Sequence, residues 1–200
     1  MVIGIIDYGM GNHASVVHSL RELGFRVRIG SEPEMLGDVD LLVLPGVGAF
    51  PTAMHHLQAH GWINFLQEKF YNDFPIIGIC LGMQLLATAS DEIQYTLGLN
   101  FIPGEVRRIS SSHAHIGWNT IACVQDDPLF QESDGLDFYF NHAFAYVGSE
   151  AYQICVSESP SPFTSVIRRQ NTVGLQFHPE KSQQAGRLLL KRLIKGLLYA

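Results

Sequence analysis

The chain has 200 residues, of which 46% are hydrophobic and 16% are charged, and this is enough for a full apolar core. Its 13 basic and 19 acidic residues give a net charge of −6, without the basic stripe that nucleic-acid-binding proteins use. The longest apolar runs, such as 41–44, have the length of strands and are too short to span a bilayer. We therefore expect neither nucleic acid nor a membrane as a partner of this chain.

The cysteine content is typical of a reducing compartment. Cys80, Cys123 and Cys155 are odd in number and contain no CxxC pair, which argues against a disulfide framework and a structural zinc site. Residues 1–4 do not begin a basic segment followed by a long apolar one, so no secretion signal is predicted and a cytoplasmic location is expected. Cys123 and Cys155 lie in apolar, strand-like segments and are predicted to be buried core thiols.

The first ninety residues alternate between short apolar runs and segments of helical periodicity. Strands are predicted at 2–6, 25–29, 39–44 and 75–79, and helices at 15–23, at 52–70 with an interruption near Gly61, and directly after residue 80. Strands separated by helices indicate a parallel sheet with helices on both of its faces.

The second half has short strands in quick succession. They are predicted at 102–109, 118–124, 137–140, 151–157, 164–169 and 173–177, and an amphipathic helix follows at 182–198. The predicted fold class is therefore α/β, with a mostly parallel or mixed central sheet flanked by helices and with antiparallel strands added in the second half. Since no repeat, linker or low-complexity segment interrupts the chain, we expect one domain over residues 1–200.

Cys80 lies between a predicted strand and a predicted helix, in the segment Gly78-Ile79-Cys80-Leu81-Gly82. Small residues two positions before and after it let the backbone turn sharply enough to present the thiol. The first amides of the helix then point at the sulfur, which favours the thiolate over the thiol. We therefore predict that Cys80 is a nucleophile.

A cysteine nucleophile needs a base that a third group holds in one tautomer. Among nine histidines, His178 lies at the end of the last predicted strand, directly before Pro179 and two residues before Glu180. The proline favours an extended backbone at His178, and residues two apart on such a backbone point the same way. Glu180 could then accept the Nδ1 hydrogen while Nε2 faces the thiol. A polar strand end with a helix cap is the alternative, and the turn around Cys80 favours the catalytic interpretation.

The segment Pro45-Gly46-Val47-Gly48 ends the third predicted strand, at the sheet edge where ligands of parallel α/β folds gather. Its two glycines permit unusual backbone dihedrals, including an amide turned toward an oxyanion. Such a segment is often only a turn. Beside Cys80 it is the best candidate for an oxyanion site, together with the amide of Leu81.

Two motifs at these positions, GICLGMQ at 78–84 and QFHPEKS at 176–182, resemble the class I, triad-type glutamine amidotransferases. Further segments resemble the glutaminase subunits of imidazole glycerol phosphate synthases, and they stand at 7–12, 44–50, 115–119 and 138–142. The similarity runs from residue 3 to residue 198 and implies a flavodoxin-like fold without a cofactor.

The resemblance implies a glutaminase that acts on the side-chain amide of L-glutamine. In this family Cys80 would attack the amide carbon, His178 would carry the proton to the departing ammonia, and Glu180 would orient the imidazole. Backbone amides near Gly48 and Leu81 would hold the oxyanion. Water would then release glutamate from the thioester.

Gln84, one helical turn after the nucleophile, resembles the family residue that helps to hold glutamine. The resemblance also implies a heterodimer with a (β/α)8-barrel synthase subunit, through which ammonia reaches a ribonucleotide intermediate of histidine biosynthesis. The glutaminase would be nearly silent without that partner. A peptide flip in the glycine segment, populated only when the partner stabilises it, gives a physical route for this control.

Some segments depart from the family pattern. Ala114 stands where proline is frequent, residues 141–144 read Asn-His-Ala-Phe in place of Val-His-Ser-Tyr, and 110–113 lack an expected basic residue. A runner-up is therefore a paralogous glutaminase that pairs with a related barrel and supplies ammonia for amidation of a bacterial surface sugar. A solitary cysteine peptidase or amide hydrolase and a catalytically idle scaffold are further alternatives.

One other cluster could indicate a metal. His55, His56 and His60 lie at helical spacing, but no carboxylate joins them, so we predict solvent-facing side chains and no metal site.

Overall fold

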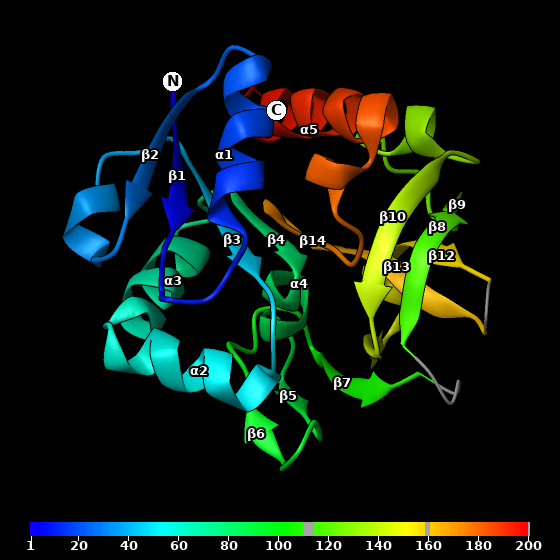
Figure 1. Cartoon of the computed structure of the whole chain (residues 1–200), viewed down its shortest axis with the longest axis horizontal. Coiled ribbons are helices and arrows are strands. Elements are labelled where there is room, and N and C mark those ends of the chain that lie inside the picture. The colour runs from blue at the N-terminus through cyan, green and yellow to red at the C-terminus, as the bar shows by residue number, and fades with distance from the viewer. Residues whose placement is uncertain (110–113, 159–160, 200) are drawn as a thin grey trace.

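The computed structural model describes residues 1–109, 114–158 and 161–199 (Figure 1), so the segment 110–113 with its missing basic residue lies outside the described residues. The helices are α1 (His13–Glu22), α2 (Phe50–Ala59), α3 (Trp62–Tyr71), α4 (Leu81–Leu85) and α5 (Gln183–Tyr199), with short 3-10 helices η1 (Pro33–Leu36), η2 (Gln131–Ser133), η3 (Glu150–Tyr152) and η4 (Pro179–Lys181). The strands are β1 (Val2–Ile6), β2 (Arg26–Gly30), β3 (Leu41–Gly46), β4 (Ile76–Cys80), β5 (Ala89–Ser90), β6 (Thr96–Leu97), β7 (Gly104–Arg108), β8 (His115–Thr120), β9 (Ala122–Cys123), β10 (Asp137–His142), β11 (Phe144–Gly148), β12 (Gln153–Ser157), β13 (Phe163–Arg169) and β14 (Thr172–Leu175).

An eight-stranded sheet forms the centre of the molecule, in the order β2-β1-β3-β4-β14-β13-β12-β9. The first five strands of this order are parallel, and β13, β12 and β9 continue the sheet antiparallel. The predicted α/β class with added antiparallel strands is thus confirmed. Not every added strand joins the central sheet, because β10 pairs with β8 and the order β11-β7-β5-β6 forms a third sheet.

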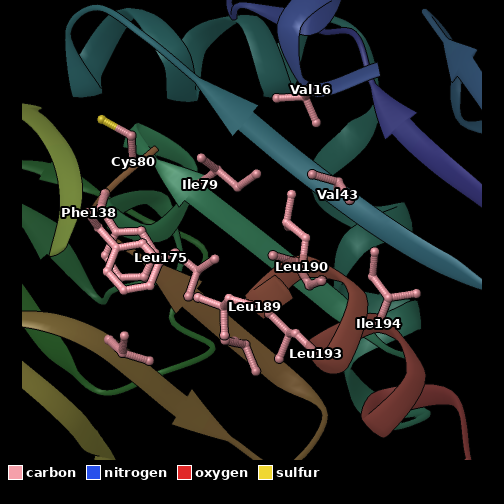
Figure 2. Close-up of a cluster of buried hydrophobic side chains, with 14 of the residues drawn as sticks. Val16, Val43, Ile79, Cys80, Phe138, Leu175, Leu189, Leu190, Leu193 and Ile194 are labelled. Carbon is pink, nitrogen blue, oxygen red and sulfur yellow. The ribbon is translucent and has the colours of Figure 1, made fainter. Parts of the chain in front are cut away.

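Both faces of the parallel strands are buried. Leu41 and Val43 of β3 point to the face covered by α1 and α5, whereas Leu42 and Leu44 point to α2 and α3. Figure 2 shows Leu190 of α5 among the buried apolar side chains on the face covered by α1 and α5. Figure 1 shows the two layers of helices on either side of the sheet. Strands buried on both faces read as continuous apolar runs, which is why this half of the chain could be predicted closely.

The predicted interruption of the helical segment 52–70 near Gly61 is confirmed, because α2 and α3 are separated at Gly61, which is in the left-handed conformation (φ +74°). Other predicted boundaries are wrong. The predicted strand 118–124 is divided into β8 and β9 at Ile121, whose side chain is buried and whose N–H donates to Leu136 O. The strand β11 was not predicted, and it forms because β7 pairs with it antiparallel. Among the described residues, no helix is both long and apolar enough to cross a membrane.

The inner side of β10 carries aromatic residues and one buried histidine. The His142 ring packs edge-on against Phe163 and His115, with centroids 4.8 and 5.6 Å away. Its Nδ1 lies 2.9 Å from Phe144 O, so Nδ1 carries the hydrogen and donates it. Burial above all, with the nearby His115 and His178, lowers the pKa of His142 to about 4 despite the hydrogen bond to Phe144 O.

We predict an acid-sensitive contribution of His142 to stability. The folded protein keeps His142 neutral down to pH about 4, whereas the unfolded chain binds the proton near pH about 6.5. The contribution is therefore complete above pH about 6.5 and is lost as pH falls toward 4, by about 2 kcal/mol at pH 5. Denaturant unfolding of wild type and His142→Asn at pH 7 and pH 5 measures it, since asparagine retains a donor in the Nδ1 position. An equal loss of unfolding free energy in both proteins would contradict the prediction.

Candidate active site

Cys80 is the last residue of β4, and its backbone is strained, with φ +54° and ψ −110°. The positive φ of a residue with a side chain is uncommon and is concentrated at functional sites. A Cβ on Gly78 would lie 2.6 Å from Gly82 O, and one on Gly82 would lie 1.8 Å from Leu44 O. Both glycines are therefore required for the turn, and Figure 2 shows the Cys80 sulfur pointing away from the apolar cluster.

His178 follows the neighbouring strand β14, which is parallel to β4. Its Nδ1 lies 2.8 Å from Glu180 Oε1, and the two side chains are only 3% and 1% exposed. The chain between them does not stay extended as predicted but turns into η4, which still brings the carboxylate to the imidazole. The Ser182 hydroxyl stabilises this turn by donating to His178 O and accepting from Tyr139 N, at 2.7 and 3.0 Å.

The imidazole of His178 is held between the thiol and the carboxylate. Nδ1 donates to Glu180, which leaves Nε2 for Cys80. Burial alone would lower the pKa of His178, but its hydrogen bonds to Cys80 and Glu180 and the charges of both groups raise it to about 9. This environment favours the imidazolium, the form that results when the base removes the thiol proton.

A cavity of about 320 Å³ opens above Cys80. Its lining consists of Val47, Gly48, Cys80, Leu81, Gln84, Glu92, Ala114, Asn141, His142, Ala143, Phe144, His178 and Lys181. Six of the eight residues predicted from sequence for the site therefore line one cavity. The other two, Gly46 and Glu180, support it from behind: Gly46 pairs with Cys80 across β3 and β4, and Glu180 lies behind His178. The volume suits a free small molecule.

The glycine segment 45–48, at the end of β3, is packed closely against its neighbours. A Cβ on Gly46 would lie 2.7 Å from the Tyr8 hydroxyl, and Gly48 has φ +104°, which a side chain would disfavour. Directly after this segment, Phe50 N at the start of α2 donates to Glu92 Oε2 at 2.8 Å. Glu92 thus holds the end of the segment and also lines the cavity.

Sequence reasoning missed the contribution of Gln176 and Glu92. Gln84 Nε2 donates both to Phe144 O at 2.8 Å and to Gln176 Oε1 at 3.2 Å. Both hydrogens of the Gln84 amide are therefore engaged, and its carbonyl oxygen is left for a ligand. Gln176 is completely buried. A glutamine at the end of an otherwise apolar strand was the available signal, since a buried amide needs a partner.

The family follows from a comparison with known proteins. A family model described as "Glutamine amidotransferase class-I" matches residues 4–195, and the chain belongs to this family. The solved structure of PurLQS from Thermotoga maritima has the same fold, with a TM-score of 0.76 at 18% identity over 98% of this chain and 97% of that chain. The structure of a glutamine amidotransferase from the same organism has a TM-score of 0.72 at 18% identity, over 100% of this chain and 99% of that chain.

Within this family the chain is similar to subunits of imidazole glycerol phosphate synthases. Subunit HisH 2 of Vibrio vulnificus is 40% identical over 93% of this chain and 90% of its own length. Subunit HisH of Carboxydothermus hydrogenoformans is 40% identical over 94% and 96%, and that of Shouchella clausii is 39% identical over 98% and 100%. This similarity spans almost the entire chain.

We predict that Gln176 acts as a positioning residue for Gln84. In Gln176→Leu the Gln84 amide loses one acceptor and can rotate, so the KM for glutamine rises by roughly 10-fold while kcat changes less. Steady-state kinetics of the assembled enzyme measures the two constants separately. Gln176→Glu retains an acceptor oxygen and should recover part of the KM. A fall in kcat at constant KM in Gln176→Leu would contradict a role in positioning the substrate contact.

Proposed function

We propose that this chain is a cytoplasmic glutaminase subunit that hydrolyses L-glutamine and passes the ammonia to a (β/α)8-barrel synthase subunit for histidine biosynthesis. The observation that carries the proposal is the arrangement of Cys80, His178 and Glu180 at one cavity, in a chain about 40% identical to imidazole glycerol phosphate synthase subunits. The same three residues argue against an idle scaffold. The similarity over nearly the full chain argues against a solitary peptidase.

The first step is attack on the side-chain amide. Cys80 Sγ bonds to Cδ of glutamine while its proton passes to His178 Nε2, and the ionised Glu180 stabilises the resulting imidazolium. The carbonyl electrons move to oxygen. Backbone amides of Gly48 and Leu81 receive that oxyanion, and each such donor is worth about 3 kcal/mol in the transition state.

The second step separates ammonia from the acyl group. The tetrahedral intermediate collapses, the C–N bond breaks, and His178 returns its proton to the leaving nitrogen. Water then attacks the thioester with His178 as the base, and glutamate leaves with the Cys80 thiol restored. His178 thus carries the proton in both halves of the reaction.

The cavity lining supports glutamine as the substrate. The Gln84 carbonyl oxygen and the Glu92 carboxylate line the same cavity as Cys80 and are acceptors for the α-ammonium group of a bound glutamine. An asparagine would be one methylene too short to place its amide at Cys80 while it keeps these contacts.

An exposed apolar face supports a protein partner. On β8, Ile116 and Trp118 are 64% and 48% exposed, and Trp118 packs edge-on against Tyr139 of β10. Exposed aromatic residues are typical of protein interfaces. The runner-up acceptor is a surface sugar reached through a related barrel, and it remains because Ala114 and Ala143, two departures from the family pattern, line the cavity.

We predict that Cys80→Ser and His178→Asn abolish synthesis from glutamine, by about 10³-fold or more, because each removes a member of the triad. Synthesis from added ammonium by the same complex should remain, since the barrel subunit then needs no glutaminase. Product formation with glutamine and with ammonium chloride measures both. Loss of the two activities together would contradict this division of labour.

We further predict that the histidine-pathway barrel subunit copurifies with this chain and raises its glutamate production by at least about tenfold. A related barrel from a surface-sugar pathway serves as the matched control. Glutamate release is measured for the chain alone and with each barrel. Full activity of the isolated chain would indicate a free hydrolase, and stimulation by the control barrel alone would favour the runner-up.

A further inference from the structure

Two cysteines face each other at the end of the central sheet, apart from the cavity. Cys123 of β9 and Cys155 of β12 are paired across the antiparallel ladder, and their sulfur atoms lie 3.0 Å apart. Val124 N donates to Ile154 O at 2.9 Å. That bond places the two cysteines at a non-hydrogen-bonded position, where side chains of neighbouring strands approach most closely.

The two thiols differ in accessibility. Cys155 is fully buried, as predicted, whereas Cys123 is only half-buried, so the prediction of a core thiol is wrong for Cys123. The difference has a structural cause, because β9 is a two-residue strand at the edge of the sheet with no strand beyond it in that sheet. A small reagent can therefore reach Cys123 first.

No charged side chain forms a hydrogen bond or ion pair with either sulfur atom among the contacts of the described residues. The described residues contain no group of three or more histidine, cysteine, aspartate or glutamate side chains that could hold a metal. The nearby charges have other partners: Asp134 accepts from Cys123 N, Asp127 pairs with Arg168, and Arg192 binds Leu129 O. Cys123 Sγ also lies 3.6 Å from Phe130 O.

We propose that Cys123 and Cys155 are a reversible oxidation site, which a small peroxide converts into a disulfide that fastens the edge strand β9 to β12. In the first step the Cys123 sulfur attacks one peroxide oxygen, and the O–O bond breaks to give a sulfenic acid and water. The Cys155 sulfur then attacks the Cys123 sulfur, and the sulfenic oxygen leaves as a second water. The two thiols lose two electrons and two protons, and the peroxide takes them up.

The rate of this reaction depends on pH. Burial, above all, raises the pKa of both thiols, and Asp134 and Asp127 raise it further, while Arg192 lowers that of Cys123. The thiol of Cys155 lowers the pKa of Cys123 and is itself made less acidic by the pair. Since the thiolate is the nucleophile, oxidation should be slow at neutral pH and faster in mild alkali.

The disulfide would close a loop that matters to the cavity. Residues 123–155 include β10 and β11, which carry Asn141, His142 and Phe144 of the cavity lining. No residue of β9 or β12 lines the cavity itself. Oxidation would thus restrict the segment that forms one cavity wall without touching the triad.

The test uses the full chain with Cys80→Ser, so that the pair supplies the only thiols. After treatment of the folded protein with hydrogen peroxide, we expect two titratable thiols to fall to none and the mass to fall by about 2 Da. Peptide mapping should join the peptides of Cys123 and Cys155, and dithiothreitol should restore both thiols. The matched control Cys80→Ser/Cys123→Ser should keep one thiol and form no internal crosslink.

Three results would overturn the proposal. In the first, peroxide leaves both thiols reduced for as long as the protein stays folded. In the second, Cys123 is oxidised further to sulfinic acid. In the third, a non-reducing gel shows that the disulfide joins two chains. The control substitutes the half-buried residue with the similarly sized serine and leaves Cys155 in place. The test is independent of glutamine hydrolysis and distinguishes this proposal from the proposed function.

Discussion

The close approach of Gly82 to the backbone of Leu44 is the constraint on which the site depends. A side chain at Gly82 would lie 1.8 Å from Leu44 O, so α4 can begin directly after β4 only because this position has none. That proximity forces Cys80 into a positive φ and lifts its sulfur out of the sheet. It also holds the helix start against β3, whose last residue, Gly46, lies opposite Cys80. The candidate nucleophile and the candidate oxyanion segment are therefore positioned by one backbone contact.

The second half of the chain completes what the parallel strands begin. His178 N donates to Tyr139 O of β10, so the small β8–β10 sheet is hydrogen-bonded to the strand end that carries the imidazole. Phe144 O of β11 accepts from both His142 Nδ1 and Gln84 Nε2. This one carbonyl therefore accepts hydrogen bonds from His142, in the buried aromatic cluster, and from Gln84, which lines the cavity. The added strands are consequently walls of the site as well as extensions of the fold.

The sequence predicts the parallel half of the fold closely, since strands buried on both faces are continuous apolar runs bounded by glycine or proline. It misses β11, because alternating aromatic and small residues at 144–148 acquire a partner only through tertiary pairing with β7. The candidate triad was accessible because Cys80 and His178 lie in local turns of distinctive composition. Gln176 was missed, since its one local signal, an amide at the end of an apolar strand, does not identify its partner Gln84, which is 92 residues away.

The three cysteines show how position determines the chemistry of one side chain. Cys80 lies at a helix start beside an imidazole, so its proton has an acceptor and its charge has a partner. Cys155 lies within the apolar cluster, where burial raises its pKa and the Cys123 sulfur lies 3.0 Å away. Cys123, half-buried on the edge strand β9, lies between these two cases. An oxidant that reaches Cys123 first would be reduced by a pair whose reaction is reversible and lies outside the cavity. Edge strands are normally a liability, and here the edge strand β9 gives the chain a thiol pair that lies apart from the candidate nucleophile.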